Sequence, residues 1–202
     1  MPRIPGSPSS EVESPAEVVE YADQAVQYVR HAVGMTLEYD SETLPVLDHY
    51  LRSVPGENAA AAHLVAATAG AYFGEVVRRR LGGEWDLPSG DPGSWRLVLT
   101  TGLWFSPAAM ALAVIVGSDE DGAHADEVTD PEADAVTGSD WDASLNAPGP
   151  LRPLVAQVLD NMADVSHADY YSLCGRLDTI EHVEAVLAGV VHARRTSTTE
   201  GD

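Results

Sequence analysis

Apolar side chains recur every three or four residues through most of this chain, and this spacing predicts helices. The first such stripe runs from Val18 to Val33 and predicts a helix over residues 15–33 that ends at Gly34. We expect Ser14 to cap this helix. Serine followed by proline, with a glutamate three residues after the serine, is typical of a helix start.

Two more helices follow from the same spacing. A stripe of leucines predicts one between Asp40 and the break at residues 54–56. The longest predicted helix covers residues 57–81 and contains Gly70 and Gly74 on a face of small side chains. Each internal glycine costs about 1 kcal/mol relative to alanine. We therefore expect another element to pack closely against that face and compensate for the cost.

The pattern changes after the long helix, where alternating apolar residues predict three short strands, 85–87, 95–100 and 103–105. Residues 97–117 carry no charge over a length that could span a bilayer. The Thr-Thr-Gly and Ser-Pro interruptions inside this stretch favour a buried strand followed by a buried helix over 106–116.

The C-terminal third predicts three helices. An amphipathic stripe begins at Leu151, a short helix begins at Ser166 and ends at Cys174 and Gly175, and Asp178 caps the last one. The fold class is therefore α+β, a mostly helical single domain with a small antiparallel β-sheet between the third helix and the C-terminal helices. We expect this domain over residues 15–195, between disordered tails at 1–14 and 196–202.

The net charge of −21 narrows the classes of ligand, since all eleven basic residues are arginine and no lysine is present. A GC-rich genome, a salt-adapted cytoplasm and a binding surface for a basic partner each account for this charge. The charge argues against nucleic acid and anionic membranes as ligands. The single cysteine and the lack of an apolar leader predict a reduced, cytoplasmic setting.

Acidic residues are concentrated in a long segment, 118–147, that contains ten acids and no basic residue. We expect an acidic loop that is either mobile or held by a partner. Trp141 lies alone among its acids and either anchors the loop on the domain or contacts a partner. The predicted partner-binding residues are Asp119, Glu120, Asp121, Asp126, Glu127, Asp140, Trp141 and Asp142.

Candidate catalytic residues are few. Glu75 lies on the crowded face of the long helix, where it acts as a base or a binding group, pairs with Arg79 or Arg96, or accepts backbone hydrogen bonds from the strand region. His63 is its candidate acid/base companion. We predict no cofactor and no metal site, because the histidines lack paired ligand spacings and cysteine partners. Nucleophile-elbow and phosphate-loop motifs are missing from the sequence as well.

Residues 37–116 resemble a family of uncharacterised bacterial domains of unknown function. The resemblance rests on LEYDSETLPVLDHYL, on the helix motif GAYFGEVVRRRLGGEW, and on WFSPAAMALAVIVG. It covers about two fifths of the chain and implies a small α+β domain without an established activity.

Two hypotheses about function remain. One is a non-enzymatic acidic binding or regulatory protein, immunity- or adaptor-like, that engages a basic protein partner and associates fastest at low salt. The alternative is a small hydrolase-type enzyme that uses Glu75 with a histidine as acid and base.

Overall fold

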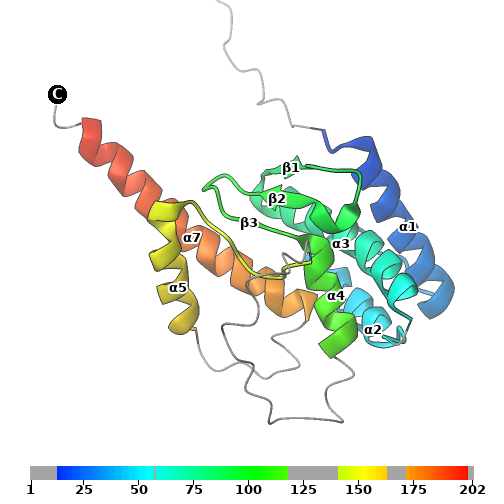
Figure 1. Cartoon of the computed structure of the whole chain (residues 1–202). Coiled ribbons are helices and arrows are strands. Elements are labelled where there is room, and N and C mark those ends of the chain that lie inside the picture. The colour runs from blue at the N-terminus through cyan, green and yellow to red at the C-terminus, as the bar shows by residue number, and fades with distance from the viewer. Residues whose placement is uncertain (1–12, 57, 118–140, 163–171, 200–202) are drawn as a thin grey trace, which may run out of the picture.

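The computed structural model describes residues 13–56, 58–117, 141–162 and 172–199, with side chains described as far as residue 193. It confirms a mostly helical α+β fold with a small antiparallel sheet (Figure 1). The helices are α1 (Ala16–Val33), α2 (Leu44–Arg52), α3 (Ala59–Leu81), α4 (Pro107–Gly117), α5 (Arg152–Asp160) and α7 (Leu173–Thr199). The strands are β1 (Glu84–Asp86), β2 (Arg96–Val98) and β3 (Trp104–Phe105), with short 3-10 turns at Ser41–Thr43, Pro92–Ser94 and Gly149–Leu151.

Helix α3 is the central packing element, with α1 and α4 against its sides (Figure 1). A Cβ atom on Gly70 would lie 2.4 Å from the Cα atom of Ala108 in α4. A Cβ atom on Gly74 would lie 2.3 Å from the indole ring of Trp85. The predicted close approach at both glycines is confirmed, and only a hydrogen in place of a side chain allows it.

The sheet has the order β1-β2-β3, and both pairings are antiparallel. Its second turn is held from outside by Glu184 of α7, which is 6% exposed. This carboxylate accepts hydrogen bonds from Oγ1 of Thr100 (3.1 Å) and Oγ1 of Thr101 (2.5 Å). The last helix therefore fixes the position of the sheet.

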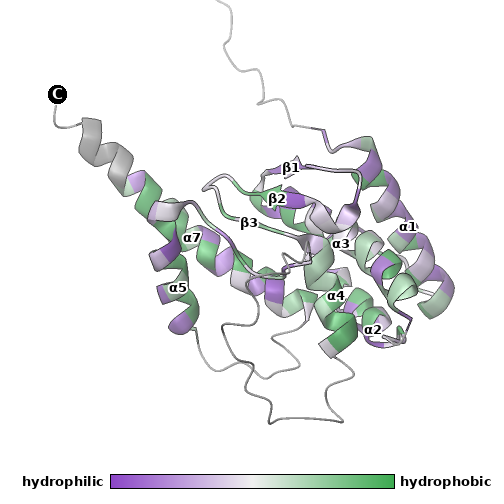
Figure 2. Ribbon diagram, viewed as in Figure 1, coloured by the Kyte–Doolittle hydropathy of each residue, from purple (hydrophilic) through white to green (hydrophobic). Residues whose placement is uncertain are grey.

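The uncharged stretch at 97–117 divides into the end of β2, a turn, β3 and the buried helix α4, as the sequence predicts. Helix α4 is apolar on nearly every side, which Figure 2 shows as almost continuous green. Among the described residues, one helix is long and apolar enough to cross a membrane. This helix is α3, and 72% of its most apolar 18-residue stretch is buried inside the protein, as in the core helix of a globular domain.

The beginning of α7 corrects the prediction for the C-terminal helices. Cys174 does not end a short helix, and Asp178 does not cap a new one, because α7 begins at Leu173 and runs through both. Asp48 of α2, buried at 3% exposure, accepts hydrogen bonds from the backbone N–H groups of Leu173 (2.7 Å) and Cys174 (3.2 Å). A carboxylate from 125 residues away thus caps the helix together with the local hydroxyl of Ser172, which accepts from the N–H of Gly175 at 2.9 Å, and Asp178 has no capping role.

Two further boundaries differ from the prediction. Pro15 is the N-cap of α1 and no side chain caps it, because the hydroxyl of Ser14 bonds elsewhere. At the other end, α7 continues to Thr199 and so enters the segment expected to be a tail from residue 196. The expected tail before residue 13, the short helix before residue 172 and most of the acidic loop lie outside the described residues.

Candidate binding cleft around Glu75

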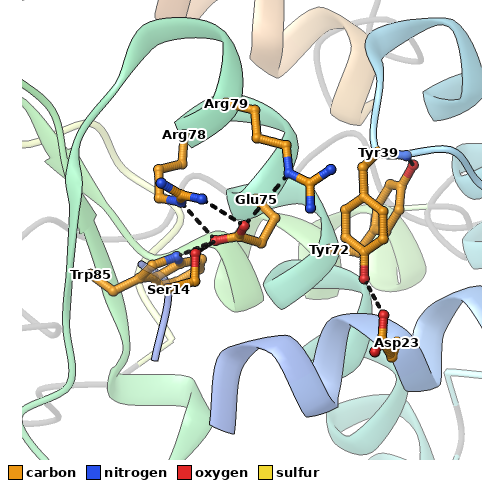
Figure 3. Close-up of polar contacts among 8 residues, drawn as sticks. All are labelled: Ser14, Asp23, Tyr39, Tyr72, Glu75, Arg78, Arg79 and Trp85. Carbon is orange, nitrogen blue, oxygen red and sulfur yellow. Dashed lines mark hydrogen bonds and ion pairs between the residues drawn. The ribbon is translucent and has the colours of Figure 1, made fainter. Parts of the chain in front are cut away.

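Among the described residues, Glu75 is the carboxylate with the most hydrogen bonds and ion pairs. It projects from α3 at 2% exposure, and Oε1 accepts hydrogen bonds from Oγ of Ser14 (2.6 Å), Nε1 of Trp85 (2.8 Å) and Nε of Arg78 (2.9 Å). Its other oxygen accepts from Arg78 at 3.1 Å and lies 3.8 Å from Nε of Arg79. Figure 3 shows these four side chains converging on the carboxylate.

This arrangement keeps Glu75 ionised. Burial favours the neutral acid, but the hydrogen bonds from Arg78, Ser14 and Trp85 favour the charged form and outweigh it. The pKa of Glu75 consequently lies below its ordinary value. A general base needs a pKa nearer neutrality and an open coordination position, so this carboxylate is a structural connector between three segments of the chain.

An open cleft of about 1410 Å³ lies beside this network. It runs between the N-terminal segment, the C-terminal turn of α3 and the β1–β2 hairpin. Its lining combines the Glu75 network with exposed acidic residues and a few apolar side chains. The lining residues are Glu13, Ser14, Val19, Glu75, Arg78, Arg79, Gly82, Gly83, Glu84, Trp85, Asp86, Val98, Leu99 and Thr100.

The outer side of the network rests on aromatic rings. The guanidinium carbon of Arg79 lies 4.2 Å from the ring centroid of Tyr39, whose ring packs against that of Tyr72. Tyr39 donates a hydrogen bond to Asp23 of α1 at 2.6 Å (Figure 3). Burial and this bond to a carboxylate raise the pKa of Tyr39 well above its ordinary value. The tyrosine hydroxyl therefore serves as a neutral donor that ties the loop after α1 back to α1, while the backbone N–H of Tyr39 donates to the hydroxyl of Tyr72 in α3 at 2.9 Å.

The two residues of the enzyme hypothesis do not come together. His63 and Glu75 are on the same helix, and their separation corresponds to about 18 Å along its axis. The exposed ring of His63 instead stacks on Trp141, with ring centroids 4.7 Å apart. Of the residues that the structure describes, no histidine lines the cleft.

Trp141 is the one aromatic residue of the predicted partner surface, and the structure places it on the domain. Besides stacking on His63, its indole ring covers Gly93, where a Cβ atom would lie 2.5 Å from the ring. Trp141 therefore contacts the domain itself, and its role toward a partner stays a prediction. Its neighbour Asp142 is exposed and accepts a hydrogen bond from the backbone of Ser144 at 2.9 Å.

The remaining predicted partner residues, Asp119, Glu120, Asp121, Asp126, Glu127 and Asp140, lie outside the described residues. No group of three metal-ligating side chains occurs in the part of the chain that the structure describes.

Cys174 lies in the first turn of α7 beside Asp48. Burial and the neighbouring carboxylate raise the pKa of its thiol to about 12. A thiol with so high a pKa is a poor nucleophile at neutral pH.

Two members of the network escape sequence reasoning. Ser14 reads as a helix cap, and Trp85 reads as the core-facing residue of a strand. The capping role commits the Ser14 hydroxyl to the backbone of the first helix, and the strand role leaves the indole N–H of Trp85 without the acceptor that it needs when buried. The proximity of Trp85 to the Gly-Gly turn after Glu75 is the signal that could have paired them.

No family model, curated protein or solved structure matches this chain. The resemblance of residues 37–116 to a family of uncharacterised bacterial domains therefore stays a prediction.

Proposed function

We propose that this chain is a non-enzymatic, acidic binding protein of the cytoplasm that engages a basic protein partner. The observation that carries the proposal is that the carboxylates fall into two groups, a few that are buried and hydrogen-bonded within the fold and others that are exposed to solvent. Asp48, Glu75 and Glu184 are buried, and each accepts two or more hydrogen bonds that join separate elements. The exposed carboxylates are the ones available to a ligand.

The charge of the whole chain supports the same conclusion. A net charge of −21 on 202 residues attracts basic surfaces and raises the rate at which they associate. The cleft carries the same sign locally, since Glu13, Glu84 and Asp86 line it while Arg78 and Arg79 turn toward Glu75. Electrostatic complementarity of this kind sets the association rate and the choice of partner.

The geometry gives little support to acid/base catalysis. Glu75 is held as a carboxylate by three hydrogen-bond donors, and its candidate companion His63 stacks on Trp141 instead. A hydrolase would need a base with a proton to take and a second group within hydrogen-bond reach of the same substrate. Immunity-type inhibition and adaptor activity need only the acidic surface.

Capture of partners at two salt concentrations tests the proposal. The immobilised protein is incubated with a lysate of the organism that encodes it, at about 50 mM and about 500 mM salt. We expect a basic protein to be retained at low salt. The purified partner should then bind with an association rate that falls steeply as salt increases. Retention of only acidic proteins, or an affinity unaffected by salt, would overturn the proposal.

A further inference from the structure

Strand β1 is an edge strand along the cleft. The sheet order places it outermost, and its three residues all line the cleft together with Gly82 and Gly83. In the described part of the chain it pairs only with β2. An edge strand presents unpaired backbone N–H and C=O groups, which are a template for another strand.

The hydrogen-bond pattern of the sheet identifies which backbone groups face outward. The N–H of Leu99 donates to the carbonyl of Leu103 at 2.7 Å, so the backbone of Leu99 faces β3. Because antiparallel strands alternate, the backbone groups of Val98 and Arg96 face β1 and meet Glu84 and Asp86 in the register. The intervening residue, Trp85, then directs its backbone N–H and C=O away from β2.

The side chains of β1 define the character of a strand that would pair there. Glu84 and Asp86 are exposed on one face, and Trp85 turns its ring to the other, toward Glu75 and α3. On the cleft side Val19 of α1 is 40% exposed. A second copy of this chain would place like charges opposite one another, which is unfavourable in cross-strand pairs. A segment with basic residues at alternate positions would meet Glu84 and Asp86 directly.

We infer that β1 receives an extended, basic segment of the partner protein as an additional strand of the sheet. The segment carries arginine or lysine at two alternate positions opposite Glu84 and Asp86, with an apolar residue between them beside Trp85 and Val19. The backbone of Trp85 supplies the main-chain hydrogen bonds, and the carboxylates select the basic side chains. This inference rests on the proposed function and names the surface that performs it.

A synthetic peptide of alternating arginine and valine is the probe. Its control has the same composition, with the arginines consecutive. We expect the alternating peptide to bind more tightly and to slow amide hydrogen exchange at Trp85. Methylation of the peptide nitrogens that face Trp85 should abolish the preference. Equal binding of the alternating and consecutive peptides, or of methylated and unmethylated ones, would overturn strand addition.

A matched pair of variants tests the surface. The double variant E84Q/D86N removes two charges from β1, and E38Q/E42Q removes two from exposed positions outside the cleft. We expect the first to weaken binding of the alternating peptide and of the captured partner about tenfold, and the second to change it less than about twofold. Equal losses of binding in the two double variants would overturn the inference about β1. The proposed function would still stand in that case if the unmodified protein captures a basic partner in a salt-dependent way. Failure of the unmodified protein to capture any basic partner would overturn the proposed function.

Discussion

The hydroxyl of Ser14 lies 2.6 Å from Oε1 of Glu75, although 61 residues separate the two in the sequence. Trp85 donates to the same oxygen at 2.8 Å. One buried carboxylate thereby joins the segment before α1, the end of α3 and the edge strand of the sheet. The stability of these three segments should depend on that carboxylate.

Replacement of Glu75 tests this dependence. We expect Glu75→Gln to lower the free energy of unfolding by about 2 kcal/mol, because the amide presents hydrogens to Arg78 and weakens charge-assisted bonds. Glu75→Ala should cost about 4 kcal/mol, since it leaves the partly buried Arg78 without its carboxylate. Urea denaturation at neutral pH measures both. The exposed control Glu38→Gln should stay within about 0.5 kcal/mol of the unmodified protein, and a similar effect at Glu75 would contradict a structural role.

The contribution of Glu75 should also depend on pH in a defined direction. Its pKa is lower in the folded state than its ordinary value of 4.5. Its stabilising effect is therefore fully present above about pH 4.5 and is lost as the pH falls toward the folded-state pKa. We expect the difference in unfolding free energy between the unmodified protein and Glu75→Gln to narrow below that pH. A difference that widens on acidification would contradict an ionised, hydrogen-bonded Glu75.

Replacing a helical glycine by alanine ordinarily stabilises a helix, but at Gly70 and Gly74 we expect the opposite effect. Gly70→Ala should destabilise the protein by about 3 kcal/mol, because the new methyl group meets the backbone of α4. Gly74→Ala should cost less, about 2 kcal/mol, since it meets the side chain of Trp85, which can shift. A methyl group added at Gly189 in α7 would have no neighbouring atom within 4 Å, so Gly189→Ala should stabilise by about 0.5–1 kcal/mol. Thermal denaturation of the three variants ranks them, and a stabilising Gly70→Ala would refute the close contact.

The remote cap of α7 gives a local prediction. Asp48→Ala removes the acceptor for the N–H groups of Leu173 and Cys174, and it should lower stability by about 2–3 kcal/mol. Amide exchange at these two residues should accelerate. Ser172→Ala is the matched control. The Ser172 hydroxyl accepts from the N–H of Gly175 at 2.9 Å, so its removal leaves the bonds from Leu173 and Cys174 to Asp48 in place. That variant should cost about 1 kcal/mol and leave Leu173 protected.

The sequence predicts the elements of this fold better than their junctions. Helical and alternating spacings locate α1 to α4 and the three strands, since periodicity follows from which face is buried. The junctions depend on distant partners. Ser14 resembles a helix cap, but its hydroxyl donates to Glu75. Asp178 resembles a helix cap too, but α7 begins at residue 173, where Asp48 accepts the backbone N–H. Local patterns carry no information about such bonds between segments far apart in the chain.

The candidate site is predictable to a similar degree. Glu75 stands out as a carboxylate among small residues, and its pairing with Arg79 is among the alternatives that the sequence offers. Arg78 and Trp85 are its closer partners, because the Gly-Gly turn brings the edge strand back over the helix. That return path depends on positive φ angles at Gly82 and Gly83.

The partners of α7 also bear on how the chain folds as the ribosome synthesises it. Asp48 and the turn at Thr100 and Thr101 emerge well before the helix that supplies their hydrogen-bond partners. Until α7 leaves the exit tunnel, Asp48 is a hydrated carboxylate and the sheet lacks its clamp at Glu184. Native assembly consequently waits until α7 has been synthesised and has left the exit tunnel, and a nascent chain stalled before residue 173 would expose the apolar surface that α7 covers.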